Sequence, residues 1–310
     1  MRPELFRLFD VGFPSYFVLL LSGFLFATAL GVLWAKRIGL DPDVIVDLGL
    51  AMLLAGVAGS RLLHVFADGY FWDYVHLCTD PSKVDWPLGR GECESKVYGG
   101  VWDAARNVCH PQNQDCFAWA KFWAGGLTYY GGFFGATAAA VVLLRRDRFP
   151  FFKAADMAGF AIPMGLAFGR LGCLLAGCCF GAPTSLPWGL SFPPGSPASE
   201  EQGKSHLLES VRHWSHPVHP TQIYESAASL AIAAFCLFWL LPRKRYDGQV
   251  FAGSLALYAI ARFVIEILRR DARGGAAGLS TSQLIGVGLL AAAALIHWRQ
   301  ARRVLPVTAS

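Results

Sequence analysis

Residues 13–34, FPSYFVLLLSGFLFATALGVLW, contain no charged side chain. An α-helix needs about 20 predominantly apolar residues to cross the hydrocarbon core of a bilayer, so this segment is long enough to span it. It is too long for a signal peptide and lacks a small-residue cleavage site, which indicates a span that is retained. The fold class therefore depends on how many segments of this kind the chain contains.

Six more apolar segments of similar length follow in the chain of 310 residues. They are residues 44–66, 122–144, 154–175, 223–241, 250–268 and 279–298. Only 16% of the residues are charged, whereas about 25% are charged in ordinary soluble domains. The sequence predicts an all-α integral membrane protein, a seven-transmembrane-helix bundle that forms a single polytopic domain over residues 1–310.

Clusters of lysine and arginine predict the orientation, because short cytoplasmic loops carry an excess of both residues. Such clusters follow the first, third, fifth and seventh spans: Lys36 and Arg37; Arg145, Arg146 and Arg148; Arg243, Lys244 and Arg245; Arg299, Arg302 and Arg303. The N-terminus is then outside and the C-terminus cytoplasmic. The cluster of Arg269, Arg270 and Arg273 is an exception on the outside. This sidedness explains the net charge of +5 better than a nucleic-acid partner does.

Two long loops, at about residues 67–121 and 182–221, are predicted to lie outside. The first contains four cysteines, namely Cys78, Cys93, Cys109 and Cys116. An even number of cysteines in an oxidising compartment favours disulfides, although the spacing does not give their pairing. Zinc is a weaker interpretation for this loop, because it contains no CxxC pair.

Ionisable residues within the predicted spans are few, and such residues usually mark function because they are costly in hydrocarbon. They are Asp47, Arg61, Asp156, Arg170, Glu225, Arg262 and Glu266. The two aspartates lie at inner helix ends, where the partial positive charge of a helix N-terminus stabilises a carboxylate. We therefore interpret them as structural. The other five lie in the outer half of the bundle, together with Tyr16 and Tyr130.

Arginines in excess over nearby carboxylates need another anion, and a guanidinium binds a lipid phosphate well through paired hydrogen bonds. Tyr258, Arg262 and Glu266 recur every four residues and form one polar stripe. Pairing of Arg262 with Glu266 is the simpler explanation of that stripe. Arg61 lies near a span end. The alternative to a phosphate-binding role for it is that its long side chain simply extends to the headgroup layer, without forming part of a binding site.

The segment GRLGCLLAGCCFG, residues 169–181, places Cys173, Cys178 and Cys179 just after Arg170. Three interpretations of these thiols stay open. They are small residues for packing, they have a redox or metal-binding role, or they alter recognition of a donor or acceptor. Adjacent cysteines rarely form a disulfide with each other without strain.

Four segments together resemble the prolipoprotein diacylglyceryl transferase family in order and spacing. They are GGLTYYGGFFGA (125–136), GRLGCLLAGCCFG (169–181), HPTQIYES (219–226) and YAIARFVIEILRRD (258–271). The resemblance implies transfer of diacylglycerol from phosphatidylglycerol to the lipobox cysteine of a prolipoprotein signal peptide. The reaction forms a thioether and releases glycerol phosphate. It also implies a bacterial inner-membrane location among membrane lipids, with the active site facing the outer leaflet, and no cofactor or metal.

The resemblance also implies roles for individual residues. Arg170 and Arg262 would hold the phosphate, with Glu266 orienting Arg262. The substrate would contact Tyr16, Arg61, Gly181, His219, Gln222, Tyr224, Glu225, Tyr258 and Arg269.

The chain departs from the family pattern at three positions. Cys173 replaces an asparagine, Cys178 replaces a glutamate, and Tyr130 replaces a histidine. As a catalytic proton acceptor, Tyr130 would need a cation such as Arg170 to lower its pKa from about 10. His219 is the best histidine candidate for a base. The alternatives to lipoprotein modification are a phospholipid-dependent transferase with a different acceptor, a thiol–disulfide membrane protein using the three cysteines, and a non-catalytic lipid or lipoprotein binder.

Overall fold

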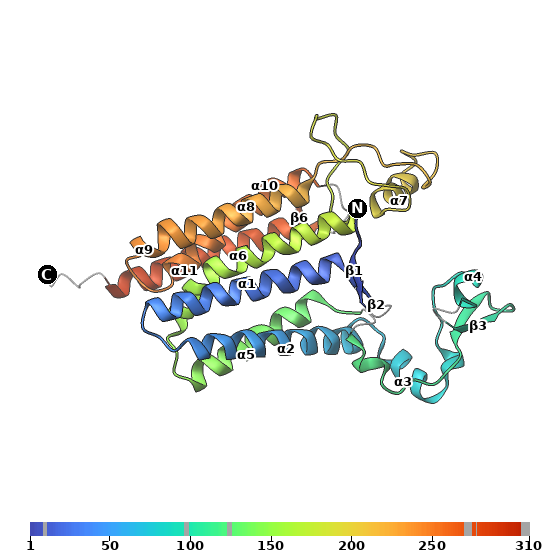
Figure 1. Cartoon of the computed structure of the whole chain (residues 1–310), viewed down its shortest axis with the longest axis horizontal. Coiled ribbons are helices and arrows are strands. Elements are labelled where there is room, and N and C mark those ends of the chain that lie inside the picture. Colours follow the sequence, from blue (N-terminus) through green and yellow to red (C-terminus); the bar gives the residue numbers. More distant parts are fainter. Residues whose placement is uncertain (9–10, 96–98, 123–125, 270–274, 277, 305–310) are drawn as a thin grey trace. The chain divides into compact units, whose positions relative to one another are not determined.

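The computed structural model describes residues 1–8, 11–95, 99–122, 126–269, 275–276 and 278–304 (Figure 1). Most of these residues are helical. The chain divides into two compact units: Met1–Ile45 with Pro150–Ser310, and Val46–Phe149.

The first unit is built around α6 (Phe151–Ala176), which packs against α1 (Ser15–Arg37), α8 (Thr221–Ala234) and α10 (Gln249–Ile267). The last helix, α11 (Thr281–Val304), packs against α10. Small residues let α1 and α6 approach closely: a Cβ atom added at Gly172 would lie 2.9 Å from the Cα of Tyr16. The central helix thus contacts the three others that carry the predicted site residues of this unit.

Two short hairpins precede membrane-length helices in this unit. Strands β1 (Glu4–Leu8) and β2 (Val11–Pro14) pair before α1, and β5 (Gly275–Ala276) and β6 (Leu279–Ser280) pair before α11. Helix α8 continues through a π-helical turn, η4 (Phe235–Leu240), into α9 (Leu241–Arg243).

Asp156 fixes the start of α10. Its Oδ1 accepts hydrogen bonds from the backbone N–H groups of Val250 and Phe251 at 2.9 and 3.2 Å, and its Oδ2 lies 2.8 Å from Nζ of Lys244. These contacts agree with the structural role predicted for this carboxylate.

The segment between α6 and α8, which we call the cap (residues 177–220), has structure of its own. It contains α7 (Pro197–Lys204), whose first turn is closed by a hydrogen bond from the Ser199 backbone N–H to the Ser196 hydroxyl. Phe192, Ala198 and Val218 form a small buried core beneath it.

The second unit begins at Val46, within α2 (Pro42–Ala67), and ends at Phe149, shortly after α5 (Tyr129–Arg146). Between these helices lie α3 (Phe71–Thr79), η1 (Pro81–Lys83), α4 (Arg90–Cys93), the paired strands β3 (Gly100–Asp103) and β4 (Val108–Pro111), and η2 (Ala118–Ala120). Disulfides join Cys78 to Cys116 and Cys93 to Cys109, which confirms the predicted disulfides and gives their pairing.

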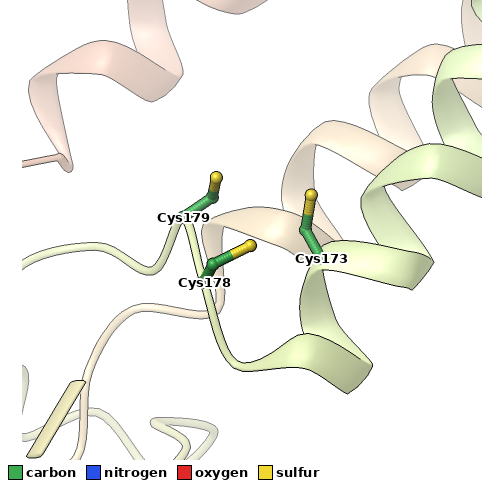
Figure 2. Close-up of side chains that lie close together, drawn as sticks. All are labelled: Cys173, Cys178 and Cys179. Carbon is green, nitrogen blue, oxygen red and sulfur yellow. The ribbon is translucent and has the colours of Figure 1, made fainter. Parts of the chain in front are cut away.

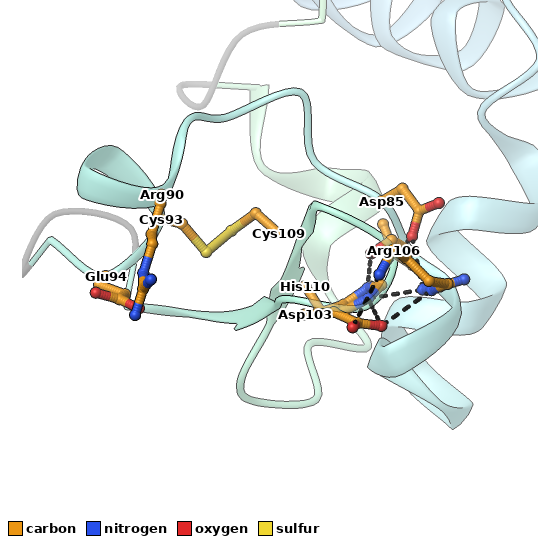
Figure 3. The surroundings of a disulfide bond; sticks show 9 residues. Asp85, Arg90, Cys93, Glu94, Asp103, Arg106, Cys109 and His110 are labelled. Atoms are coloured by element: carbon orange, nitrogen blue, oxygen red, sulfur yellow. Dashed lines mark hydrogen bonds and ion pairs between the residues drawn. A yellow bond between two sulfur atoms is a disulfide. The ribbon is translucent and has the colours of Figure 1, made fainter.

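Polar contacts around the second disulfide hold the β3–β4 hairpin (Figure 3). His110 Nδ1 lies 2.8 Å from the Val84 carbonyl oxygen, and Arg106 Nε donates to Asp103 at 3.1 Å. Hydrogen bonds from the backbone and side chain of Arg106 hold the pKa of Asp103 below its usual value. This loop is therefore ordered by two covalent bridges and a local ionic cluster.

Six of the seven predicted spans are present as helices long and apolar enough to cross a membrane. The predicted span 122–144 differs, because α5 begins only at Tyr129. Just before it, Gly126 has a φ of +66°, and its carbonyl accepts a hydrogen bond from Arg61 at 3.1 Å, so the backbone there does not continue the helix. The seven-helix count and the orientation of the termini remain predictions.

Candidate functional site

The predicted site residues of the first unit gather at the end of α6, the start of α8 and the last half of α10. Helix α6 ends because Gly177 adopts a left-handed conformation with φ +75°, and its backbone N–H bonds back to the Leu174 carbonyl. The chain then passes through Cys178 to Gly181, a stretch that we call the thiol loop (residues 178–181).

A buried carboxylate joins three helices. Glu225 on α8 is 2% exposed, and its Oε1 lies 2.8 Å from Nη2 of Arg170 on α6. The Tyr258 hydroxyl on α10 donates to the same oxygen at 3.4 Å. Within the part of the chain that the structure describes, Arg170 Nε and Glu225 Oε2 are buried without a hydrogen-bond partner. Arg170 is thus held through only part of its hydrogen-bonding capacity.

A second arginine is held one turn further along α10. Arg262 Nη2 lies 2.6 Å from Glu266 Oε2 and donates to the Ser282 hydroxyl at 3.1 Å. Glu266 also accepts a hydrogen bond from Ser280 at 2.9 Å. Arg262 Nη1 is buried and has no partner among the described residues. The geometry lets Glu266 orient Arg262 while a further donor stays available.

The sequence analysis expected arginines in excess over nearby carboxylates, and the structure divides these arginines between the two units. Arg170 and Arg262 each pair with one carboxylate, and Arg269 is buried just beyond Glu266. Arg61, which was counted in the excess, belongs to the second unit.

Arg61 is bound by backbone carbonyls of its own unit. Its Nε and Nη2 donate to Trp119 and Ala118, both at 2.7 Å, and its guanidinium lies 5.1 Å from the ring centroid of Tyr74. These contacts make Arg61 a clamp between α2 and the segment before α5, and they explain its burial without headgroup contact. Its role in lipid binding stays a prediction.

Tyr130 also belongs to the second unit. It is the second residue of α5, and its side chain is exposed beside the ring of Tyr129. Its role as a proton acceptor stays a prediction.

The thiol loop is fastened to the start of α8. Gln222 Nε2 donates to the Cys178 carbonyl and Thr221 Oγ1 donates to the Cys179 carbonyl, both at 2.7 Å. A Cβ atom at Gly181 would lie 2.7 Å from the Leu268 carbonyl oxygen and 2.7 Å from the Cβ of His219. Only glycine fits there without a shift of backbone atoms.

The remaining predicted substrate contacts form two small groups. The Tyr224 hydroxyl accepts a hydrogen bond from Trp188 Nε1 at 2.7 Å and lies 3.5 Å from His219 Nδ1. Tyr16 is half exposed in the first turn of α1, beside Gly172. Eight of the nine predicted substrate-binding residues thus lie in the first unit, and Arg61 does not.

The three cysteines of this region converge, as Figure 2 shows at the end of α6. Their sulfur atoms all lie within 4.8 Å of one another. Cys173 is buried, whereas Cys178 and Cys179 are partly buried. Hydrogen bonds to its sulfur from Cys173 and Cys178, together with nearby Arg170 and Arg269, lower the pKa of the Cys179 thiol. The sequence left open a redox or metal-binding role for these cysteines, but it did not predict that all three sulfur atoms would lie close together.

A cavity of about 260 Å³ adjoins the thiol loop within the cap. Cys179 and Gly181 line one part of it, and Glu201, Gln202 and Val218 line another. Sequence reasoning missed these cap residues, because the only signal was a loop long enough to have structure of its own.

Comparison with known proteins places this arrangement in a family. The family model described as prolipoprotein diacylglyceryl transferase matches residues 94–299. A relative from Clostridium tetani is 27% identical over 287 residues, 93% of each chain. One from Clostridium perfringens is 25% identical over 297 residues, covering 96% of this chain and 94% of its own.

A third relative, from Polynucleobacter necessarius, is 35% identical over 163 residues, about half of each chain. All three bear the name phosphatidylglycerol–prolipoprotein diacylglyceryl transferase. The family match covers about two thirds of the sequence and includes α5 to α10 and most of α11. The chain therefore belongs to the prolipoprotein diacylglyceryl transferase family.

Proposed function

We propose that this protein transfers the diacylglyceryl group of phosphatidylglycerol to the lipobox cysteine thiol of prolipoproteins. The products are a thioether-linked lipoprotein precursor and glycerol phosphate. Family membership and relatives that align along nearly the whole chain support the reaction. The observation that carries it is the pair of arginines on α6 and α10, each ion-paired yet with a buried donor left over.

The two arginines suit an anionic headgroup. A guanidinium binds phosphate oxygens through charge-assisted hydrogen bonds, which are stronger than neutral ones. Arg170 Nε and Arg262 Nη1 supply donors that no described protein atom takes. As the carbon–oxygen bond to the phosphate breaks, negative charge grows on the leaving group, and donors fixed in a buried site stabilise that charge.

The two glutamates act as positioning residues. A buried charge without a partner is costly, so Glu225 and Glu266 allow the guanidiniums to be buried. Each carboxylate contacts only one end of its arginine, at 2.8 and 2.6 Å. The ion pairs therefore orient the arginines and still leave one N–H donor of each guanidinium available.

The surrounding polar side chains complete the proposed headgroup site. Gln222 and Tyr258 are linked to the thiol loop and to Glu225, respectively. Gly181 keeps the loop close to His219 and the end of α10. Tyr16, Tyr224, His219 and Arg269 are proposed to contact glycerol or phosphate oxygens. Tyr130 and His219 are the candidate proton acceptors for the incoming thiol.

We place the protein in a bacterial inner membrane, with seven helices, the N-terminus outside and the C-terminus cytoplasmic. The six membrane-length helices and the basic clusters after four of the predicted spans support this arrangement. The two disulfides support an oxidising outer compartment for the loop at residues 67–121. The active site then faces the outer leaflet, where lipid headgroups and the signal peptide meet.

The test is transfer from labelled phosphatidylglycerol to a lipobox peptide by the purified chain. Arg170→Ala and Arg262→Ala should each lower the rate by about 10²–10³, the effect of removing one oxyanion donor. Arg243→Ala is the matched control, because this arginine lies in α9 and packs on Trp239 of η4, beyond the far end of α8 from the site. Near wild-type rates in both site variants would overturn the proposed phosphate contacts.

A further inference from the structure

The three thiols at the end of α6 have the geometry of a metal-binding site. Their sulfur atoms lie within 4.8 Å of one another (Figure 2). Zinc–sulfur bonds of about 2.3 Å place two sulfur ligands about 3.8 Å apart in a tetrahedral site. Even the two sulfur atoms that lie farthest apart therefore need to approach each other by only about 1 Å to reach that spacing.

The backbone already fixes these positions. The Cys178 N–H donates to the Cys173 carbonyl at 3.1 Å, and both loop carbonyls are held by α8 side chains at 2.7 Å. Cys179 has a φ of +63°, a left-handed conformation that a non-glycine residue keeps only where its surroundings impose it. The protein thus maintains an unfavourable backbone conformation that brings the third thiol to the other two.

The ligand type selects the ion. Thiolates favour zinc and other soft ions over magnesium or calcium. Three thiolates around a divalent zinc ion carry a net charge of −1, and Arg170 and Arg269 provide nearby positive charge for Cys179. Zinc sites with three protein ligands characteristically keep a fourth position for water or substrate.

We infer that Cys173, Cys178 and Cys179 bind one Zn²⁺ ion, and that its fourth position takes the acceptor thiol and deprotonates it. The acceptor part rests on the proposed function, whereas the metal site does not. Zinc makes a coordinated thiol lose its proton. Cys179 also lines the 260 Å³ cavity in the cap, which leaves open space next to the ligand set.

The chemical step is balanced without any other reagent. The acceptor thiol binds zinc and releases its proton to water, leaving a zinc-bound thiolate. The sulfur electron pair then forms a bond to the diacylglyceryl carbon, while the carbon–oxygen bond to phosphate breaks. That bonding pair leaves with glycerol phosphate, and the thioether product dissociates from the ion.

Cobalt titration of the full chain in detergent tests the metal site without any activity measurement. Chelator-stripped protein should bind one equivalent of Co²⁺ with thiolate-to-metal absorption, and one equivalent of Zn²⁺ should displace it. Cys173→Ser, Cys178→Ser and Cys179→Ser should each lower the affinity at least tenfold. Cys236→Ser is the matched control, because this free cysteine lies outside the cluster.

Alkylation of the unmodified protein provides a second readout, independent of how the variants fold. Zn²⁺ should protect Cys178 and Cys179, the two partly exposed thiols, from iodoacetamide, as read by mass spectrometry of their peptides. Absence of an equivalent of bound metal, or equal alkylation with and without Zn²⁺, would overturn the site.

The acceptor part has its own measurement. A lipobox peptide should shift the cobalt absorption, and the same peptide with serine for cysteine should not. Chelation should lower diacylglyceryl transfer at least tenfold, with recovery on one equivalent of Zn²⁺. Unchanged transfer by metal-free protein would overturn the acceptor role. Metal-loaded protein whose spectrum responds to the thiol peptide, yet which transfers no lipid, would support the site and contradict the proposed function.

Discussion

Arg170 is expected to contribute both to the stability of the fold and to the rate of lipid transfer. Removing its side chain, alone and together with the charge of Glu225, separates these two contributions. The Glu225 side chain is 2% exposed in the wild-type protein, and Arg170→Ala removes its ion-pair partner, so that the Tyr258 hydroxyl at 3.4 Å is the nearest described group that still donates to it. Breaking a buried ion pair from one side costs about 3–5 kcal/mol. That loss corresponds to a fall of roughly 10 °C in the melting temperature of a domain of about this size.

The double variant Arg170→Ala with Glu225→Gln tests the reasoning. A neutral amide does not carry the desolvation cost of the carboxylate, so most of the lost stability should return. Transfer activity should not return, because the proposed phosphate donors remain absent. The measurements are thermal unfolding in detergent and lipid transfer to a lipobox peptide. An Arg170→Ala protein as stable as wild type, or a double variant that recovers full activity, would refute the argument.

Three further predictions concern the surrounding structure. Gly181→Ala should destabilise the protein by about 1–3 kcal/mol through overpacking, because its Cβ would lie 2.7 Å from the Leu268 carbonyl oxygen; Gly91→Ala, with no atom of the described residues within 4 Å of the added carbon, should not lower the melting temperature. Replacing Cys93 and Cys109 with serine should cost roughly 3 kcal/mol, as expected for a loop of about this length, measured by unfolding of the second unit and compared with wild type after reduction. Burial lowers the pKa of Lys244, but its ion pairs with Asp156 and Asp247 outweigh burial and raise it. The stability gained is therefore complete below the unfolded pKa of about 10.4 and is lost as pH rises through the higher folded pKa; alkaline unfolding curves of wild type and Lys244→Met should converge at high pH, and parallel curves would contradict this pairing.

The helices could be predicted because their signal is local. Length and apolar composition decide whether a segment crosses a bilayer, and six predicted spans agree with the structure to within a few residues, apart from the last, which extends to Arg303. The third span was predicted too long, since the conformation of Gly126 and the clamp by Arg61 depend on residues far apart in sequence. Composition alone does not report such contacts.

The site was predictable in its charges but not in its pairing. Arginines and glutamates stand out in apolar segments, and four of them form two ion pairs in the structure. The partners of Arg61 are backbone carbonyls, which carry no sequence signal. Likewise, the disulfide pairing and the meeting of Cys173 with the thiol loop depend on how the chain turns after α6 and within the outer loop.

Complementation tests the proposed reaction most directly. The chain is expressed in bacteria depleted of their own diacylglyceryl transferase, and a reporter lipoprotein is analysed by mass spectrometry. We expect growth to recover and the reporter's lipobox cysteine to gain the mass of one diacylglyceryl group. A correctly inserted chain that leaves this cysteine unmodified would contradict the account.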